Sequence, residues 1–329
     1  MTGRALVLDA PGAYRIVEAA PADPGPGEAR IRVHASGVCG SDRELYQGTR
    51  PAGYVWYPVI PGHEWSGTVE AVGAGVPEAL LGRKTVGEGF RNCQVCARCH
   101  AGETTLCTAG YEETGFTQPG AMADTLVLPA RLLHPLADGA DLTAAALLEP
   151  AACVAAAALK AEARPGERVA VVGTGTLGMI AVQFLAAGSP AELLVIGVDR
   201  DREKLAHDFG ATSFRTADEP LPDDFDVVIE AAGSADAART AAGLLRRGGR
   251  LVLTGLPAPG AAGLDPTDLV VRQTEVRTVF GAPPAAWAHA VRAFDAGLLD
   301  LLPLVTHRLP LEGFAEAMAP GAGKVLLHP

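Results

Sequence analysis

The 329-residue sequence predicts an α/β protein of two domains, with a β-rich first domain and a doubly wound second domain. Strand-like segments bounded by Gly and Pro turns lie within residues 1–36 and 115–135, which predicts the β-rich domain. From about residue 150 onward, short apolar runs alternate with helical segments, as is typical of a parallel sheet covered by helices. We expect a last strand at residues 323–327 to return to the first domain.

Composition limits the function classes. The chain is 48% hydrophobic, and its formal charge of -11 argues against binding to nucleic acid or to an anionic membrane surface. Residues 169–191 carry no charge and are long enough to span a bilayer, but four glycines and Pro190 interrupt them. Arg4 and Asp9 bracket too short an apolar run for a signal peptide. We therefore expect a soluble, cytoplasmic protein with reduced cysteines.

Four of the six cysteines fall within fifteen residues, with the spacing C-x2-C-x2-C-x7-C. Four thiolates this close can hold one dication in tetrahedral geometry and leave no open position, so a zinc ion here would be structural. Disulfides, scattered buried thiols and an iron–sulfur cluster are the alternatives; the absence of a secretion signal and the x7 gap without a following Pro favour zinc. The candidate ligands are Cys93, Cys96, Cys99 and Cys107.

Two glycine-rich turns of the first domain carry a second candidate metal site. Cys39 is followed by the hydroxyl of Ser41, and His63 is followed by the carboxylate of Glu64. Taken alone, Cys39 is explained as a buried thiol and His63 as a turn histidine. Thiolate and imidazole together, in a β domain that already has a thiolate cluster, favour a zinc site.

An alanine-rich stretch begins the second domain. It predicts a short helix over residues 143–148 and a longer one over 150–161, with Pro150 in its first turn. Glu149 lies between them, and a carboxylate among apolar residues needs a partner, so Glu149 is a candidate metal ligand or a neighbour of one. The alternative is a solvated carboxylate at a helix start. Cys153 is expected to pack in the core.

A glycine-rich turn joins a predicted buried strand at residues 168–172 to an apolar helix at 179–187, and a strand at 193–198 follows. This order is the dinucleotide-binding fingerprint G-x-G-x-x-G in its structural context, and it predicts a Rossmann domain. The first glycine allows the tight turn, the second lets a pyrophosphate approach the backbone, and the third lets helix and strand pack closely. The turn consists of Gly173, Thr174, Gly175, Thr176, Leu177 and Gly178.

Asp199 follows the second strand of this unit, 21 residues beyond Gly178. A carboxylate there can accept hydrogen bonds from both ribose hydroxyls and repels a 2′-phosphate, so NAD is the expected cofactor. Because Arg200 lies beside Asp199, NADP stays an alternative cofactor. The alternation continues with predicted strands at 226–233, 249–255 and 275–281. We count the strand at 275–281 as the sixth strand of this domain. Helices are predicted at 235–245 and 287–296.

Together these motifs resemble the zinc-containing medium-chain dehydrogenase/reductase family of alcohol and polyol dehydrogenases. The match runs in order through GVCGSD, GHEWSG, the four-cysteine segment 93–107 (the cysteine lobe), the Glu149–Pro150 junction, GTGTLG and the GKVLL tail. It implies a GroES-like catalytic domain over residues 1–148, completed by 284–329, and an NAD(P)-binding Rossmann domain over 149–283. Family members are usually dimers or tetramers assembled through an edge strand, here 275–281.

The resemblance assigns roles to single residues. Cys39 and His63 match the ligands of a catalytic zinc, and Glu149 fits the position where sorbitol and threonine dehydrogenases place a carboxylate. Glu64 resembles a glutamate that lies beside the metal and sometimes enters its ligand shell. Glu149 and Glu64 are therefore both candidates for the third protein ligand. Ser41 corresponds to the hydroxyl that relays the substrate proton.

The implied reaction is hydride transfer from a secondary alcohol of a polyol or cyclitol to NAD(P), assisted by the second, catalytic zinc of each chain. Lys324 lies where the family often has a basic residue near the cofactor phosphates. Glu44 departs from the family pattern, which has a relay histidine there. Three alternatives follow: the relay uses the Glu44 carboxylate, it passes the proton directly to water, or Glu44 binds a cationic substrate. CGSD..LY.G, PGHEWSG and residues 112–116 look most similar to 2-deoxy-scyllo-inosamine dehydrogenases, which makes an aminocyclitol a candidate substrate.

Other functions compete with this interpretation. A sugar or threonine-type alcohol dehydrogenase would keep the same motifs. A zinc-free quinone reductase shares the fold but has no use for the cysteine lobe, and a non-enzymatic NAD-sensing protein could lose Ser41 without consequence. A zinc-ribbon nucleic-acid binder needs a basic patch that the lobe lacks.

Overall fold

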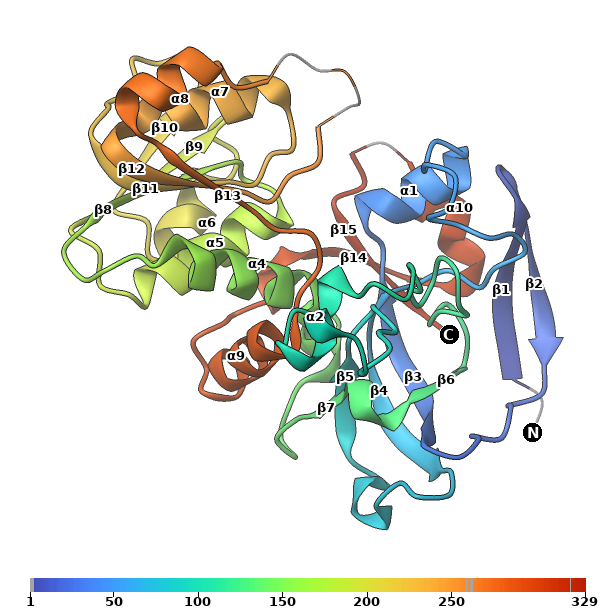
Figure 1. Cartoon of the computed structure of the whole chain (residues 1–329). Coiled ribbons are helices and arrows are strands. Elements are labelled where there is room, and N and C mark those ends of the chain that lie inside the picture. Colours follow the sequence, from blue (N-terminus) through green and yellow to red (C-terminus); the bar gives the residue numbers. More distant parts are fainter. Residues whose placement is uncertain (1–2, 258–259, 261–262, 320) are drawn as a thin grey trace. The chain divides into compact units, whose positions relative to one another are not determined.

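The computed structural model describes residues 3–257, 260, 263–319 and 321–329. The chain forms two compact units (Figure 1). The first unit contains residues 1–149, 283–295 and 301–329, and the second contains 150–282 and 296–300. Both the chain's beginning and its end therefore belong to the first unit.

A six-stranded parallel sheet forms the second unit, in the order β10-β9-β8-β11-β12-β13. Helices cover both of its faces: α5 and α6 lie on one side and α7 and α8 on the other (Figure 1). This strand order is that of the doubly wound dinucleotide-binding fold, which confirms the Rossmann prediction. The strands are β8 (Arg168–Val172), β9 (Glu192–Gly197), β10 (Ser213–Thr216), β11 (Phe225–Glu230), β12 (Leu245–Leu253) and β13 (Glu275–Thr278).

Helix boundaries in this unit lie within a few residues of the predicted ones. The strand β10 was not predicted, because its four residues SFRT have no apolar run. The long alanine-rich helix begins two residues before Pro150, which therefore occupies its first turn as expected. The helices are α4 (Leu148–Ala161), α5 (Thr176–Ala186), α6 (Glu203–Asp208), α7 (Ala235–Leu244) and α8 (Pro266–Arg272).

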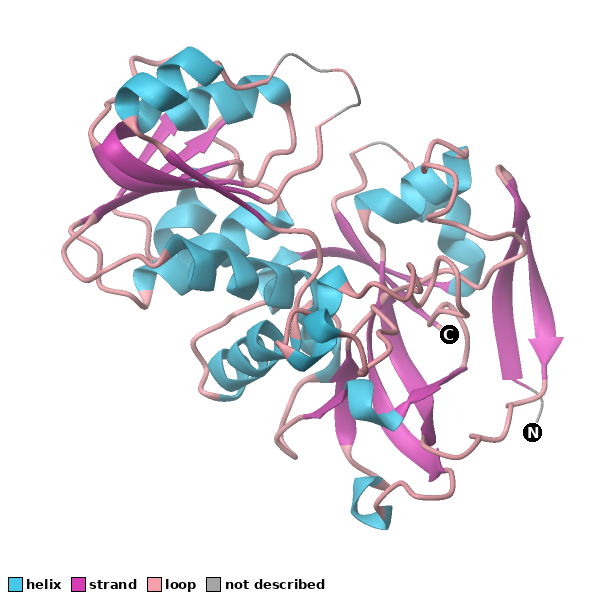
Figure 2. Ribbon diagram, in the orientation of Figure 1, coloured by secondary structure: helices cyan, strands magenta, loops and turns pink. Residues whose placement is uncertain are grey.

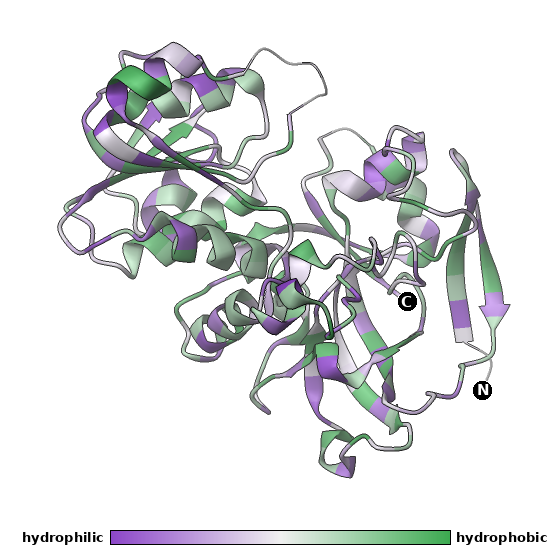
Figure 3. Ribbon diagram, in the orientation of Figure 1, coloured by the Kyte–Doolittle hydropathy of each residue, from purple (hydrophilic) through white to green (hydrophobic). Residues whose placement is uncertain are grey.

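The uncharged run at residues 169–191 forms the core strand β8 and the buried helix α5. Figure 3 shows the hydrophobic colour along both elements. Because helices cover both faces of the sheet, β8, β9 and β11 are buried on both sides and need apolar residues at nearly every position. Among the residues that the structure describes, no helix is long and apolar enough to cross a membrane.

A seven-stranded sheet forms the first unit, in the order β14-β15-β3-β4-β5-β7, with β6 paired to β3. The strands β1 (Gly3–Ala10) and β2 (Ala13–Ala19) form a separate two-stranded ribbon (Figure 2). The last strand pairs with β3, so it returns to the first sheet as predicted. The sheet's members are β3 (Glu28–Gly37), β4 (Glu64–Val72), β5 (Lys84–Gly87), β6 (Thr125–Pro129), β7 (Leu133–Pro135), β14 (Val305–Pro310) and β15 (Lys324–His328).

Several helices of the first unit pack on this sheet: α3 on β3 and β4, α9 on β7, and α10 on β14. The predicted helix at 287–296 begins three residues earlier, since Pro284 suits a first helical position. Its Trp287 stacks on His134, with ring centroids 5.3 Å apart. The helices are α1 (Gly40–Gln47), α2 (Ala97–His100), α3 (Leu142–Ala145), α9 (Pro284–Asp295) and α10 (Phe314–Ala317).

The register of β3 decides which residues meet at one edge of the first sheet. Gly37, the last residue of β3, pairs with Glu64 at the start of β4 and with Leu326 near the start of β15. Both pairings are antiparallel, so the end of β3 and the beginnings of its two neighbours lie together. Residues that follow β3 and precede β4 therefore face the same region.

Arg250 is a buried cation that joins three segments of the second unit. Its Nη1 donates to the carbonyl oxygens of Ala161 and Glu162, at the C-terminal end of α4. Its Nη2 donates to both carboxylate oxygens of Glu167, at 2.5 and 2.6 Å. The guanidinium thus satisfies helix-end carbonyls that have no intrahelical partner.

We expect Arg250→Met to lower the free energy of unfolding by about 2–4 kcal/mol, since it leaves the Glu167 carboxylate and two carbonyls without their donor. Urea unfolding monitored by circular dichroism measures this. Arg247→Met, at an exposed position nearby, is the matched control and should change stability by less than about 0.5 kcal/mol. A similar decrease in the free energy of unfolding in both variants would show that the contacts of Arg250 do not stabilise the fold specifically.

Candidate active site

The four lobe cysteines converge on one point. Their Sγ atoms all lie within 4.8 Å of one another, and the Sγ atoms of Cys93 and Cys99 are 3.9 Å apart. Four thiolates bound to one zinc at about 2.3 Å have their sulfurs about 3.8 Å apart, so the observed spacing fits a tetrahedral zinc. All six cysteines of the chain are free thiols, which removes the disulfide alternative.

Backbone N–H groups point at these sulfurs. The N–H of Cys93 donates to Cys107 Sγ at 3.4 Å, and the N–H of Cys99 donates to Cys96 Sγ at 3.5 Å. Hydrogen bonds from the backbone of Thr108 and Cys99 lower the pKa of Cys96 to about 5, whereas burial raises the pKa of Cys99 to about 12. Backbone hydrogen bonds thus favour the thiolate form, which is the form that binds a metal, at Cys93 and Cys96.

A second group consists of Cys39, His63 and Glu64, whose ligand atoms also lie within 4.8 Å of one another. The pairing of β3 with β4 explains this, because Cys39 follows β3 and His63 precedes β4. The fold therefore brings together three residues that sequence analysis had singled out. A Cβ at Gly37 would lie 2.1 Å from Glu64 Oε2, so only glycine leaves room for this carboxylate.

Asp42 supports both Cys39 and His63. Its Oδ2 accepts the N–H of Cys39 at 2.8 Å, and its Oδ1 lies 3.6 Å from His63 Nδ1. Burial lowers the pKa of His63, but Asp42 and Cys39 together raise it more, so this pKa lies well above its usual value. Among the described residues, His63 Nδ1 and Asp42 Oδ1 have no hydrogen-bond partner despite their burial. This orientation leaves Nε2 for a metal, and the donor set of thiolate, imidazole and carboxylate suits a catalytic zinc.

Lys324 neutralises Glu64. Its Nζ lies 2.8 and 2.7 Å from the two Glu64 oxygens and 3.3 Å from the carbonyl oxygen of Val38, so all three of its N–H groups are used. Burial lowers the pKa of Lys324, but the charges of Glu64 and Cys39 raise it above its usual value. The predicted role of Lys324 at the cofactor phosphates stays a prediction, and sequence analysis missed this partner 260 residues away.

Glu149, Ser41 and Glu44 surround this group. Glu149 opens helix α4, outside the group of three ligand atoms, yet its charge raises the pKa of both Lys324 and Glu113. Ser41 and Glu44 are three residues apart on helix α1, hence on one helical face. The Glu44 side chain is 47% exposed and lies 3.9 Å from Arg50. The roles of these three residues stay predictions.

In the second unit, the glycine-rich turn has the backbone geometry that the sequence predicted. Gly173 has a φ of 116°, and a Cβ on Gly178 would lie 1.9 Å from the Gly173 carbonyl oxygen. Both positions therefore require glycine, for the turn and for close packing. Nothing lies within 4 Å of a Cβ placed on Gly175, where Thr176 and Leu177 begin α5, so a ligand can approach the backbone there.

Asp199 is exposed just after β9, where its Oδ1 accepts the N–H of Asp201. Arg200 turns away from it toward two carboxylates, Glu203 at 2.7 Å and Glu219. Glu219 is itself anchored, because its Oε2 accepts the N–H of Thr216. Arg200, the cation that left NADP as an alternative cofactor, is therefore already paired with two carboxylates.

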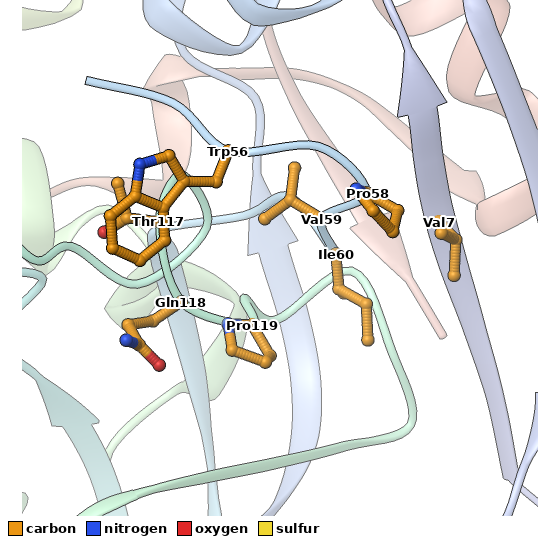
Figure 4. Close-up of a pocket in the computed structure, with 8 residues that line it drawn as sticks. All are labelled: Val7, Trp56, Pro58, Val59, Ile60, Thr117, Gln118 and Pro119. Carbon is orange, nitrogen blue, oxygen red and sulfur yellow. The ribbon is translucent and has the colours of Figure 1, made fainter. Parts of the chain in front are cut away.

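The first unit also has an apolar pocket (Figure 4). Trp56 and Ile60 point into it from one loop and Pro119 from another, beside strand β1. None of its lining residues is a cysteine, histidine or carboxylate. The lining residues are Val7, Trp56, Pro58, Val59, Ile60, Thr117, Gln118 and Pro119.

Comparison with known proteins identifies the family. Residues 25–138 match the alcohol dehydrogenase GroES-like domain, and residues 176–296 match the zinc-binding dehydrogenase domain. An L-threonine 3-dehydrogenase of Anaeromyxobacter sp. (strain Fw109-5) is 31% identical over 97% of this chain and 96% of its own length. The cobalt- and zinc-bound thermostable alcohol dehydrogenase from Pyrobaculum aerophilum is 32% identical over all of both chains, with a TM-score of 0.89.

A protein from Sinorhizobium meliloti 1021, solved with NADP bound, is 26% identical over all of both chains, with a TM-score of 0.92. The chain therefore belongs to the zinc-dependent medium-chain dehydrogenase family. It is an oxidoreductase that works with zinc and a nicotinamide cofactor. Both the GroES-like and the Rossmann part of the fold prediction are confirmed.

Cys96→Ser should remove the structural zinc and destabilise the protein by more than about 2 kcal/mol, because the metal supplies much of the lobe's folding energy. Elemental analysis and thermal unfolding measure the two effects. Cys153→Ser, at the cysteine outside both groups, is the control and should keep the metal content of wild type. Full metal content in Cys96→Ser would contradict the four-thiolate site.

Proposed function

We propose that this protein is a zinc-dependent dehydrogenase that oxidises a secondary alcohol of a polyol or cyclitol with NAD. The aminocyclitol 2-deoxy-scyllo-inosamine belongs to this substrate class. The observation that carries the proposal is the group of Cys39 and His63 at one sheet edge, with Asp42 behind the imidazole. A threonine-type activity is the second candidate, supported by the L-threonine 3-dehydrogenase relatives.

We assign the catalytic domain to residues 1–148 with 284–329, and the cofactor domain to 149–283. A homodimer or homotetramer is the proposed assembly, through the sheet edge at β13, where Val276 is 38% and nearby Phe280 47% exposed. The proposed compartment is the cytoplasm, where the six free thiols stay reduced.

Cys39, His63 and Glu149 are the proposed ligands of the catalytic zinc, with Glu64 kept beside it by Lys324. A bound zinc supplies Lewis-acid polarisation of the substrate hydroxyl. Glu64 is the less suitable ligand, because both of its oxygens already accept from a buried ammonium group.

Proton transfer is assigned to helix α1. The Ser41 hydroxyl is two residues after Cys39, and as both donor and acceptor it can take a proton from a substrate hydroxyl and pass it on. Glu44 lies one turn further along the same face and is half exposed, so it can deliver the proton to water. A carboxylate thus does what a histidine does in the family pattern.

Cofactor binding is assigned to the second unit. Gly173, Gly175 and Gly178 shape a turn whose N–H groups, with those of Thr176 and Leu177, face the pyrophosphate at the start of α5. Asp199 accepts hydrogen bonds from the ribose hydroxyls. Its exposed carboxylate and the pairing of Arg200 with Glu203 and Glu219 favour NAD over NADP.

Turnover on a panel of polyols, aminocyclitols and L-threonine with NAD tests the function. We expect oxidation of at least one cyclitol, and His63→Ala should lower kcat/KM by roughly a thousandfold or more because the catalytic metal is lost. His307→Ala, at an exposed histidine, is the control. Turnover of L-threonine alone would replace the polyol proposal by the second candidate, and undiminished activity in His63→Ala would contradict both.

Asp199→Ala should weaken NAD binding about tenfold, because hydrogen bonds from hydroxyls to a charged acceptor are lost. Glu219→Gln should strengthen NADP binding a few-fold, because it frees Arg200 from an exposed ion pair. Fluorescence titration of each variant measures both affinities, with Asp201→Ala as a control at a neighbouring exposed carboxylate. Tighter binding of NADP than of NAD by wild type would refute the assignment of Asp199.

A further inference from the structure

Glu230 is a buried carboxylate at the carboxyl end of strand β11, in the middle of the parallel sheet. It is 2% exposed and pairs in register with Val172, the last residue of β8. Strand β9 lies on the other side of β8, so the strand order reverses between β8 and β11. In doubly wound sheets a dinucleotide binds outside the carboxyl ends of the strands at this reversal. Glu230 therefore lies at the part of the sheet edge where the cofactor is expected.

The turn that follows β11 holds the Glu230 carboxylate. Its Oε1 accepts the N–H groups of Ala232 and Gly233, at 2.8 and 2.7 Å. Among the described residues, no lysine, arginine or histidine forms an ion pair with Glu230. Backbone N–H dipoles thus stabilise this carboxylate, and no side-chain cation neutralises it.

Glycines pack this turn against its two neighbours. A Cβ on Gly173 would lie 2.8 Å from the backbone nitrogen of Ala232, so the turn after β11 touches the glycine-rich turn after β8. A Cβ on Gly255, which follows β12, would collide with the backbone of Gly233 and lie 2.9 Å from Glu230 Oε2. Glu230 therefore lies where the turns at the carboxyl ends of β8, β11 and β12 meet.

The turns after β8 and β11 differ in what their N–H groups can bind. After β8, nothing lies within 4 Å of a Cβ placed on Gly175, so a phosphate can approach the start of α5. After β11, Glu230 accepts two N–H groups of the turn, and the Ser234 hydroxyl accepts that of Ala237 at 3.1 Å. The chain's own oxygen atoms therefore occupy the start of α7, and this turn carries a negative charge instead of an anion site.

The two redox states of the cofactor differ in charge at the nicotinamide ring, which is cationic in NAD and neutral in NADH. The fold consists of two mononucleotide-binding halves, and Asp199, the proposed partner of the adenosine ribose, follows β9 in the first half. The nicotinamide half of the cofactor is therefore assigned to β11, β12 and β13, whose first turn holds Glu230. A fixed negative charge in a buried setting attracts a nearby cation more strongly than it would in water.

We propose that Glu230 sets the preference of this enzyme between the two redox states of its cofactor, and that its charge favours NAD over NADH. This inference rests on the cofactor assignment of the proposed function and does not depend on which alcohol is the substrate. Because binding and reduction form a thermodynamic cycle, the same factor shifts the equilibrium of the bound cofactor toward NAD. A lower relative affinity for NADH favours release of the reduced cofactor during alcohol oxidation.

The test measures the dissociation constants of NAD, by calorimetry, and of NADH, by fluorescence, for zinc-loaded full-length protein. Glu230→Gln keeps an oxygen acceptor for the two N–H groups and removes the charge. We expect it to weaken NAD binding relative to NADH binding by roughly threefold to tenfold. Glu230→Asp keeps the charge and should keep the wild-type ratio of the two constants, whereas Glu230→Asn should shift the ratio as Glu230→Gln does. Asp223→Asn, at an exposed carboxylate before the opposite end of β11, should change neither constant.

Equal changes in the two dissociation constants of Glu230→Gln would overturn the inference, because they would show that the carboxylate only supports the turn. A ratio that shifts as far in Glu230→Asp as in Glu230→Asn would overturn it too, since that pair differs in charge alone. Thermal unfolding of each variant confirms that the fold survives, and the Asp and Asn pair decides the question if Glu230→Gln does not fold.

The same measurements separate this inference from the proposed function. Wild type that binds neither NAD nor NADH would contradict the cofactor assignment and the role of Glu230 together. Wild type that binds both cofactors but oxidises no alcohol would contradict the proposed function, and the shift of the ratio in the neutral variants would still support the role of Glu230.

Discussion

The pairing of β3 with both β4 and β15 is the constraint on which the candidate metal centre depends. Gly37 faces Glu64 on one side and Leu326 on the other. A slip of one residue in either pairing would turn every side chain of that strand to the opposite face. It would separate Cys39 from His63, and Lys324 from Glu64. The absence of a side chain at Gly37 matters for the same reason, because Glu64 Oε2 occupies that space.

Buried charge is the second feature of this region. Glu64 is paired with Lys324, His63 faces Asp42, and Glu113 faces Arg50. Charged groups withdrawn from water are tolerated only with such partners, so each pair fixes the position of the other. The result is a candidate metal centre whose proposed ligands are held by neighbours on strands β3, β4 and β15 and on the first turn of α1. This preorganisation is what a catalytic site needs for fixed ligand geometry.

Local patterns were sufficient to predict much of the architecture. The cysteine spacing, the glycine-rich turn and the alternation of apolar strands and helices are each contained within about thirty residues, which is the scale of one βαβ unit. The order of these motifs was enough to suggest the family. The strand β10 escaped prediction because it has only four residues, and β2 because it has a half-exposed pattern without a continuous apolar run.

Partners distant in sequence could not be predicted. Nothing near Lys324 indicates that it pairs with Glu64, because the contact depends on strand register across the whole first unit. Similarly, Glu113 was noted only as part of a motif, and its contact with Arg50 requires two loops 63 residues apart to meet. The third metal ligand illustrates the remaining limit, since sequence analysis favoured Glu149 and could not exclude Glu64.

Diffraction from zinc-loaded crystals, with anomalous data collected on either side of the zinc absorption edge, tests the central claim most directly. The account predicts two zinc peaks in each chain. One should lie among the sulfurs of Cys93, Cys96, Cys99 and Cys107, and the other should contact Cys39 and His63 with Glu149 as the third protein ligand. A single peak, or a second peak away from Cys39 and His63, would contradict the account.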